Sequence, residues 1–122
     1  MRPAVDIADR DLESLDSIWS GGLGDAYEAY RDRHPDGRVA LAAALVETGV
    51  TLQGLGVRGA PAGELLIGDL CLARASRLLA DAGDQDLQVA FARAVERVAA
   101  EAAAGAPVSP IRDLLQSALA TP

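Results

Sequence analysis

The sequence predicts an all-α protein, a helical bundle of five or six helices that forms a single domain over residues 1–122. Apolar residues recur at spacings of three, four and seven, as they do on one face of a helix. No stretch alternates with a period of two in a β-branched or aromatic background, so we expect no strand. Only four residues are aromatic, so the core must consist of Leu, Val, Ile and many Ala. Such small side chains favour close helix packing.

Two amphipathic segments are expected before residue 34. The first covers Asp6 to Trp19 and should end at the Gly21-Gly22 pair. The second covers Leu23 to Arg33 and is followed by a turn at 34–37. Their apolar faces carry Ile7, Leu12, Leu15, Ile18 and Trp19, and then Leu23, Ala26, Tyr27 and Tyr30. The three large aromatic residues of these faces, Trp19, Tyr27 and Tyr30, are either core or interface anchors or the lining of a hydrophobic ligand site.

A nearly uncharged segment follows from Arg38 to Leu55. Glu47 is the only ionisable residue between positions 39 and 57. A helix that is apolar on every side belongs in the middle of a bundle. Gly49 and Gly54 lack side chains and would let a neighbouring backbone or a ligand approach closely. Residues 56–63 are rich in glycine and indicate a loop.

Three more helices are indicated in the second half of the chain. The first runs from Glu64 to Ala82 and is capped by Gly83. Asp84 is a suitable N-cap for the next helix. We expect Ser109 to cap the last helix, with Pro110 at its first position. The helix after Asp84 has the most regular apolar face, which consists of Leu87, Phe91, Val95 and Val98.

The composition excludes several classes of function. The net charge is −7, whereas binding to nucleic acid or an anionic membrane requires a basic patch. Cys71 is the only cysteine, so no intramolecular disulfide can form, and its leucine neighbours indicate a buried thiol. We expect a cytoplasmic protein without a membrane-spanning helix. His34, the only histidine, lies beside a proline in a turn and is expected to be a solvent-exposed loop residue rather than a metal ligand or a base.

Two stretches carry a resemblance to a known family. Leu65 to Ala75 contains the run Gly68-Asp69-Leu70-Cys71-Leu72-Ala73-Arg74-Ala75, and the similar stretch continues through Gly83-Asp84 to Glu101. Upstream, Ala42 to Gln53 has the form Ala-x-x-hydrophobic-Glu followed by a small and apolar run. Together these pieces resemble the trans-prenyl diphosphate synthase family over residues 40–105. The resemblance implies part of the isoprenoid synthase fold.

The catalytic motifs of that family are missing. The positions where its first aspartate-rich motif would bind magnesium are Gln53-Gly54-Leu55, and the next acidic residue is Glu64. We therefore expect no catalytic residue, no metal and no cofactor. The resemblance implies that Arg58 is a remaining contact for a diphosphate. Asp69, which lies in the best-matching motif, is expected to make a buried hydrogen bond or to face an arginine such as Arg74.

The resemblance implies a non-catalytic small or regulatory subunit that associates with a catalytic prenyl diphosphate synthase and shapes its product tunnel. A domain of this size has too little interior to bury two largely apolar helices, so an exposed patch and an oligomer are expected. A homodimer and a heteromer both remain open. The expected interface residues are Leu45, Val46, Val50, Leu52, Leu66, Leu70 and Ala73.

Two alternatives belong to other classes of function. One is a homodimeric, degenerate prenyl-synthase-like protein that binds an isoprenoid or another apolar ligand, with Gly49 and Gly54 providing space. It predicts a sizeable apolar cavity in the monomer and binding without magnesium. The other is an unrelated helical interaction protein.

Overall fold

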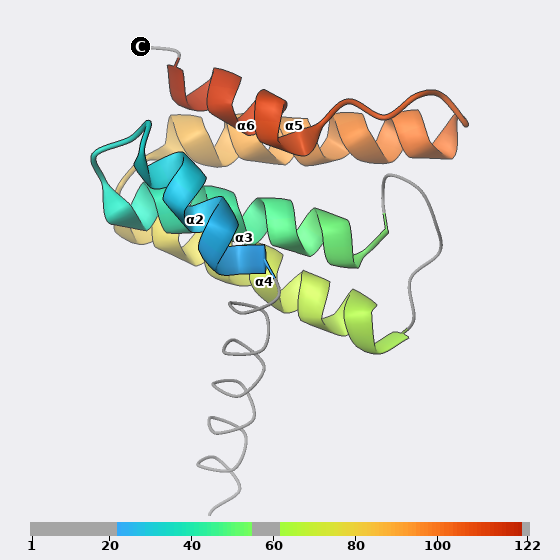
Figure 1. The fold of residues 1–122 in the computed structure, drawn as a ribbon, viewed down its shortest axis with the longest axis horizontal. Coiled ribbons are helices and arrows are strands. Elements are labelled where there is room, and N and C mark those ends of the chain that lie inside the picture. Colours follow the sequence, from blue (N-terminus) through green and yellow to red (C-terminus); the bar gives the residue numbers. More distant parts are fainter. Residues whose placement is uncertain (1–21, 55–61, 121–122) are drawn as a thin grey trace, which may run out of the picture.

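The computed structural model describes residues 22–54 and 62–120, and within these ranges it contains five helices and no strand. The all-α prediction is confirmed for this part of the chain. The helices are α2 (Gly24–Arg31), α3 (Gly37–Leu52), α4 (Ala62–Asp81), α5 (Gln85–Ala103) and α6 (Ile111–Ala120) (Figure 1). The segment expected over Asp6 to Trp19 and most of the loop expected over 56–63 lie outside the described residues. Among the described helices, none is long and apolar enough to cross a membrane.

The helix α3 lies at the centre, as its uncharged sequence predicts. Its first turn is capped by Asp36, whose Oδ1 accepts a hydrogen bond from the Arg38 N–H at 2.9 Å. The other four helices all pack against it (Figure 1). Of the two largely apolar helices that the domain was expected not to bury, α3 is buried, whereas α4 leaves Leu65 and Leu66 exposed. Nine residues of α3 are buried: Val39, Ala40, Ala42, Ala43, Ala44, Leu45, Val46, Gly49 and Val50.

The helices α3 and α4 approach each other closely at two glycines. A Cβ atom placed on Gly68 would lie 2.9 Å from the Gly49 carbonyl oxygen, and one placed on Gly49 would lie 3.0 Å from the Gly68 carbonyl oxygen. A side chain at Gly68 would force the two helices apart, and one at Gly49 would require its neighbours to move by a few tenths of an ångström. The expected close approach at Gly49 is confirmed, but α4 fills the space that the ligand hypothesis assigned to it. Gly54 instead has a φ of +68° just beyond the end of α3.

The connection from α4 to α5 agrees with the prediction. Gly83 has a φ of +73° and ends α4. The Asp84 side chain accepts a hydrogen bond from the Leu87 N–H at 3.1 Å, so it caps α5. The tight turn brings α5 back along α4, and the apolar face of α5 turns inwards, with Phe91 and Val98 buried.

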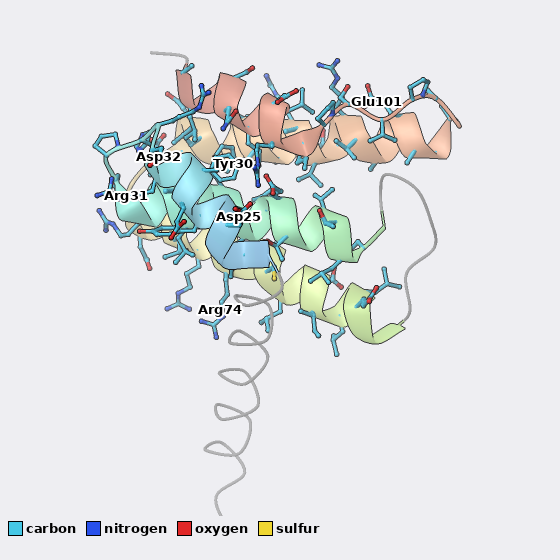
Figure 2. All side chains as sticks on the ribbon, in the orientation of Figure 1. Asp25, Tyr30, Arg31, Asp32, Arg74 and Glu101 are labelled. Atoms are coloured by element: carbon cyan, nitrogen blue, oxygen red, sulfur yellow. The ribbon has the colours of Figure 1, made fainter. Side chains whose placement is uncertain are left out.

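The start of α6 differs from the prediction by one residue. The Pro110 carbonyl accepts the first helical hydrogen bond, from the Leu114 N–H at 3.3 Å, so proline takes the N-cap position and α6 begins at Ile111. Ser109 does not act as the cap. Its N–H and its hydroxyl both donate to the Glu101 carboxylate, at 2.8 and 3.0 Å. Glu101 therefore holds the segment that joins α5 to α6 (Figure 2).

Candidate functional site

An apolar groove of about 320 Å³ lies between α4 and α5. Four of its lining residues are buried: Val46 of α3, Ala75 and Leu79 of α4, and Phe91 of α5. The apolar lining is completed by Leu72 of α4 and by Ala92 and Val95 of α5. The groove is open to the surface, because Ala92 is exposed and Leu72 and Val95 are only half-buried.

Helical periodicity explains why these side chains share one surface. Leu72, Ala75 and Leu79 follow each other by three and four residues on α4, and Phe91 and Val95 are four apart on α5. Two antiparallel helices that both carry such a stripe form an apolar furrow where they separate. The small Ala75 and Ala92 keep that furrow unfilled.

Polar residues mark the rim of the groove. The Gln88 Nε2 donates a hydrogen bond to the Ser76 carbonyl oxygen at 3.1 Å and so connects α5 to α4. Glu96 adds a negative charge to the rim on α5. The groove contains no nucleophile paired with a base, and the described residues contain no group of three or more His, Cys, Asp or Glu that could hold a metal. Its lining is suited to noncovalent binding of an apolar surface.

The most exposed large hydrophobic residues lie on the two helices that form the groove. Leu66 is 71% exposed, Val89 is 51% exposed and Leu65 is 40% exposed. Leu65 precedes Leu72 by seven residues, which places it on the groove side of α4. Val89 and Ala92 are three residues apart on α5 and are therefore neighbours on the helix surface.

The structure separates the expected interface residues into two groups. Leu45, Val46 and Val50 are buried against helices of their own chain, and of these only Val46 borders the groove. Leu52 is half-buried at the end of α3. The three residues from α4 lie nearer the surface: Leu66 and Ala73 are exposed, and Leu70 is half-buried. Arg58 and Trp19 lie outside the described residues.

A polar cluster that we did not predict joins three helices. Glu47 of α3, only 17% exposed, accepts hydrogen bonds from the Tyr30 hydroxyl of α2 at 2.8 Å and from Arg112 Nε and Nη2 of α6 at 2.8 and 2.9 Å. Arg112 Nη2 also lies 3.6 Å from Asp25 Oδ2. Figure 2 labels Asp25 and Tyr30, which both come from α2. The only sign of this cluster in the sequence was the single charged residue, Glu47, in an otherwise apolar helix. Its partner Arg112 is 65 residues away, so no local pattern connects the two.

The chemistry of this cluster is structural. Burial and the adjacent Glu47 carboxylate raise the pKa of Tyr30 well above its ordinary value, so the phenol stays protonated as a donor. The hydrogen bonds to Glu47 raise the pKa of Arg112. A paired guanidinium and carboxylate with a neutral phenol have no free base, and their effect is to tie α2 and α6 to α3.

Three other expected residues are placed as follows. Asp69 makes the expected kind of hydrogen bond, from Gln53 Nε2 at 2.6 Å, but it is exposed, so the expectation of a buried bond is wrong. Cys71 is completely buried, as predicted, and burial raises the pKa of its thiol. His34 lies in the turn but is half-buried, since its Nδ1 accepts a hydrogen bond from the Asp36 N–H at 3.1 Å. The prediction of a solvent-exposed histidine is wrong because this bond folds the ring onto the turn.

Comparison with known proteins gave no matching family model, no matching curated protein and no matching solved structure. The likeness to the trans-prenyl diphosphate synthase family stays a hypothesis that rests on the sequence motifs.

Proposed function

We propose that this chain is a non-catalytic association domain that binds an α-helix of a partner protein in the groove between α4 and α5. One observation carries the proposal: an open apolar groove lies between two helices, and further exposed hydrophobic residues, Leu65 on α4 and Val89 on α5, lie on the same two helices. Exposed apolar surface rimmed by polar residues marks interaction sites.

The shape of the groove favours a helix as its occupant. Two neighbouring helices form its walls, and α3 forms its base. An amphipathic helix placed there would bury its apolar face between α4 and α5 and complete the bundle. Ala75 and Ala92 would let the incoming backbone approach closely. The chain carries a net charge of −7 and Glu96 lies on the rim, so a helix with basic flanks would fit best.

The sequence resemblance supports a particular partner. If the motifs over residues 40–105 reflect descent from the prenyl synthase family, the partner is a catalytic prenyl diphosphate synthase subunit. This chain would then act indirectly, by holding a helix that forms a wall of the product tunnel. Catalysis and magnesium binding would stay with the partner.

An apolar small molecule is a second candidate occupant. A volume of about 320 Å³ is at the lower end of the range for ligand sites, and the groove has a mainly apolar lining. An isoprenoid chain could lie along it. This candidate differs from the first because it needs no second protein.

A matched pair of variants tests the proposal. Ala92→Arg places a long cation in the groove from an exposed position, whereas Ala120→Arg makes the same change at the exposed end of α6, which does not border the groove. Each tagged protein is purified from its source cells and its stoichiometric partners are identified by mass spectrometry. We expect wild type and Ala120→Arg to retain a prenyl synthase that carries both aspartate-rich motifs, and Ala92→Arg to lose it.

Two other results would contradict the proposal that the groove between α4 and α5 binds a helix of a partner protein. Retention of the partner by Ala92→Arg would show that the groove is not its binding site. If no protein co-purifies, calorimetric titration with a prenyl alcohol decides between the two occupants. Binding to wild type and Ala120→Arg but not to Ala92→Arg would favour the small molecule.

A further inference from the structure

The groove between α4 and α5 has two unlike ends. The two helices are joined at the turn that contains Gly83, and they run apart from there (Figure 1). Gln88 lies near the start of α5, at the joined end, and its Nε2 donates a hydrogen bond to the Ser76 carbonyl oxygen at 3.1 Å. This bond connects the two walls of the groove with polar groups. The apolar lining therefore ends at Gln88 on the side of the turn.

Beyond Gln88 the surface is polar. A second hollow, of about 480 Å³, lies at the α4–α5 turn, and Gln88 borders both this hollow and the groove. The second hollow contains two carboxylates and no large apolar side chain; its other lining residues are Ala80, Gly83, Asp84, Gln85 and Asp86. An apolar group placed there would remove water from carboxylates and amides without replacing their hydrogen bonds, which is unfavourable.

At the opposite end of the groove, exposed apolar surface continues along α4. Leu72 lines the groove, and Leu65, which is 40% exposed, precedes it by seven residues. Two residues seven apart lie on the same side of a helix. The apolar side chains of a bound helix can therefore continue towards Leu65, whereas towards the turn they must stop.

We propose that Gln88 fixes the position of the bound helix along the groove, because the apolar stripe of that helix must end there. This inference rests on the proposed function, since it concerns the same groove. The last apolar side chain of the partner helix then packs near Leu79 and Phe91, and a polar side chain follows it at Gln88. Gln88 thus selects partner helices by where their apolar stripe ends.

Two synthetic helical peptides and a pair of matched variants of the full chain test this role. The first peptide has an apolar stripe with a glutamine at each end of the stripe, and in the second peptide leucine replaces both glutamines. Gln88→Leu makes the boundary of the groove apolar with little change in side-chain size. Gln116→Leu is the control, because Gln116 is half-buried like Gln88 but lies on α6 and borders neither hollow.

The readout is the ratio of the dissociation constants of the two peptides, measured by fluorescence anisotropy. We expect Gln88→Leu to shift this ratio by about threefold in favour of the leucine-ended peptide, because one further leucine is then buried. Gln116→Leu should leave the ratio as in wild type. An unchanged ratio in Gln88→Leu, with both peptides bound, would overturn the role of Gln88 and leave the helix-binding groove intact.

Failure of the proposed function would look different. If neither peptide binds the wild-type protein, or if Ala92→Arg binds both as tightly as wild type does, the groove does not hold a helix. The inference about Gln88 would then be overturned together with the proposed function.

Discussion

The central helix α3 makes two contrasting contacts, one with α4 and one with the α5–α6 pair. Against α4 it packs backbone to backbone, at Gly49 and Gly68. Against α5 and α6 it packs through side chains, and its Glu47 carboxylate accepts two hydrogen bonds from the Arg112 guanidinium of α6. The first contact leaves no room, whereas the second leaves open spaces beside it. One helix therefore supports both a tightly packed unit, α2–α3–α4, and a less tightly packed α5–α6 hairpin.

Two of the open spaces in the described part of the chain lie where the hairpin meets the α2–α3–α4 unit. One is the groove of about 320 Å³ between α4 and α5. The other, of about 420 Å³, lies between the end of α3 and the start of α6, and includes Val50, Val98 and Ile111. Since dense packing excludes a ligand or partner, surfaces available for binding are expected where the hairpin meets the unit.

The largest effect is expected at the glycine contact. In Gly68→Ala the new methyl group would lie 2.9 Å from the Gly49 oxygen and 2.6 Å from Gln53 Cγ, so the helices must separate. We expect the free energy of unfolding to fall by about 2–3 kcal/mol. The control is Gly63→Ala, also in α4, where a Cβ would meet nothing within 4 Å. Urea denaturation should show an unchanged or slightly higher stability for the control; equal losses in both variants would contradict the close contact.

The next effect is expected at the polar cluster. Arg112→Met removes both hydrogen bonds to the Glu47 carboxylate, which is largely buried. We expect a loss of about 2 kcal/mol, less than for a fully buried pair because the Arg112 side chain is 37% exposed. Arg93→Met makes the same substitution at an exposed position of α5 and should change little. A similar stability for both variants would show that the cluster does not hold the hairpin.

The smallest effect is expected where Glu101 holds the α5–α6 connection. The hydrogen bond from the Ser109 N–H lowers the pKa of Glu101 below its ordinary value of 4.5. Because the pKa of Glu101 is lowered in the folded state, the ionised carboxylate contributes to the free energy of unfolding above pH 4.5. This stabilisation is lost as the pH falls through the pKa that Glu101 has in the folded protein. Wild type should therefore be more stable than Glu101→Gln at pH 7, and this difference should shrink at pH 3. If the urea midpoints of wild type and Glu101→Gln differ equally at both pH values, the ionised Glu101 carboxylate does not stabilise the α5–α6 connection.

Local patterns predicted the helices well but not their contacts. The caps at Gly83 and Asp84 and the central position of α3 follow from residue type and periodicity, which act over a few positions. The hydrogen bonds from Arg112 to Glu47 join residues far apart in sequence, so no local pattern could indicate them. The groove depends on how far α4 and α5 separate, which is set by tertiary packing and not by a local pattern in either helix. Leu45 and Val50 were predicted to be interface residues for the same reason. An apolar side chain alone does not show whether a residue packs in the core of its own chain or against a partner.

Native-state hydrogen exchange, resolved by residue, tests most directly whether the hairpin is the less stable region. We predict that amides of α3 and α4 near Gly49 and Gly68 exchange only through global unfolding, whereas amides of α5 and α6 exchange through a partial opening of lower free energy. Arg112→Met should lower the free energy of this opening further without changing the relative protection within α3 and α4. Equal protection of both regions in the wild-type protein would contradict the account.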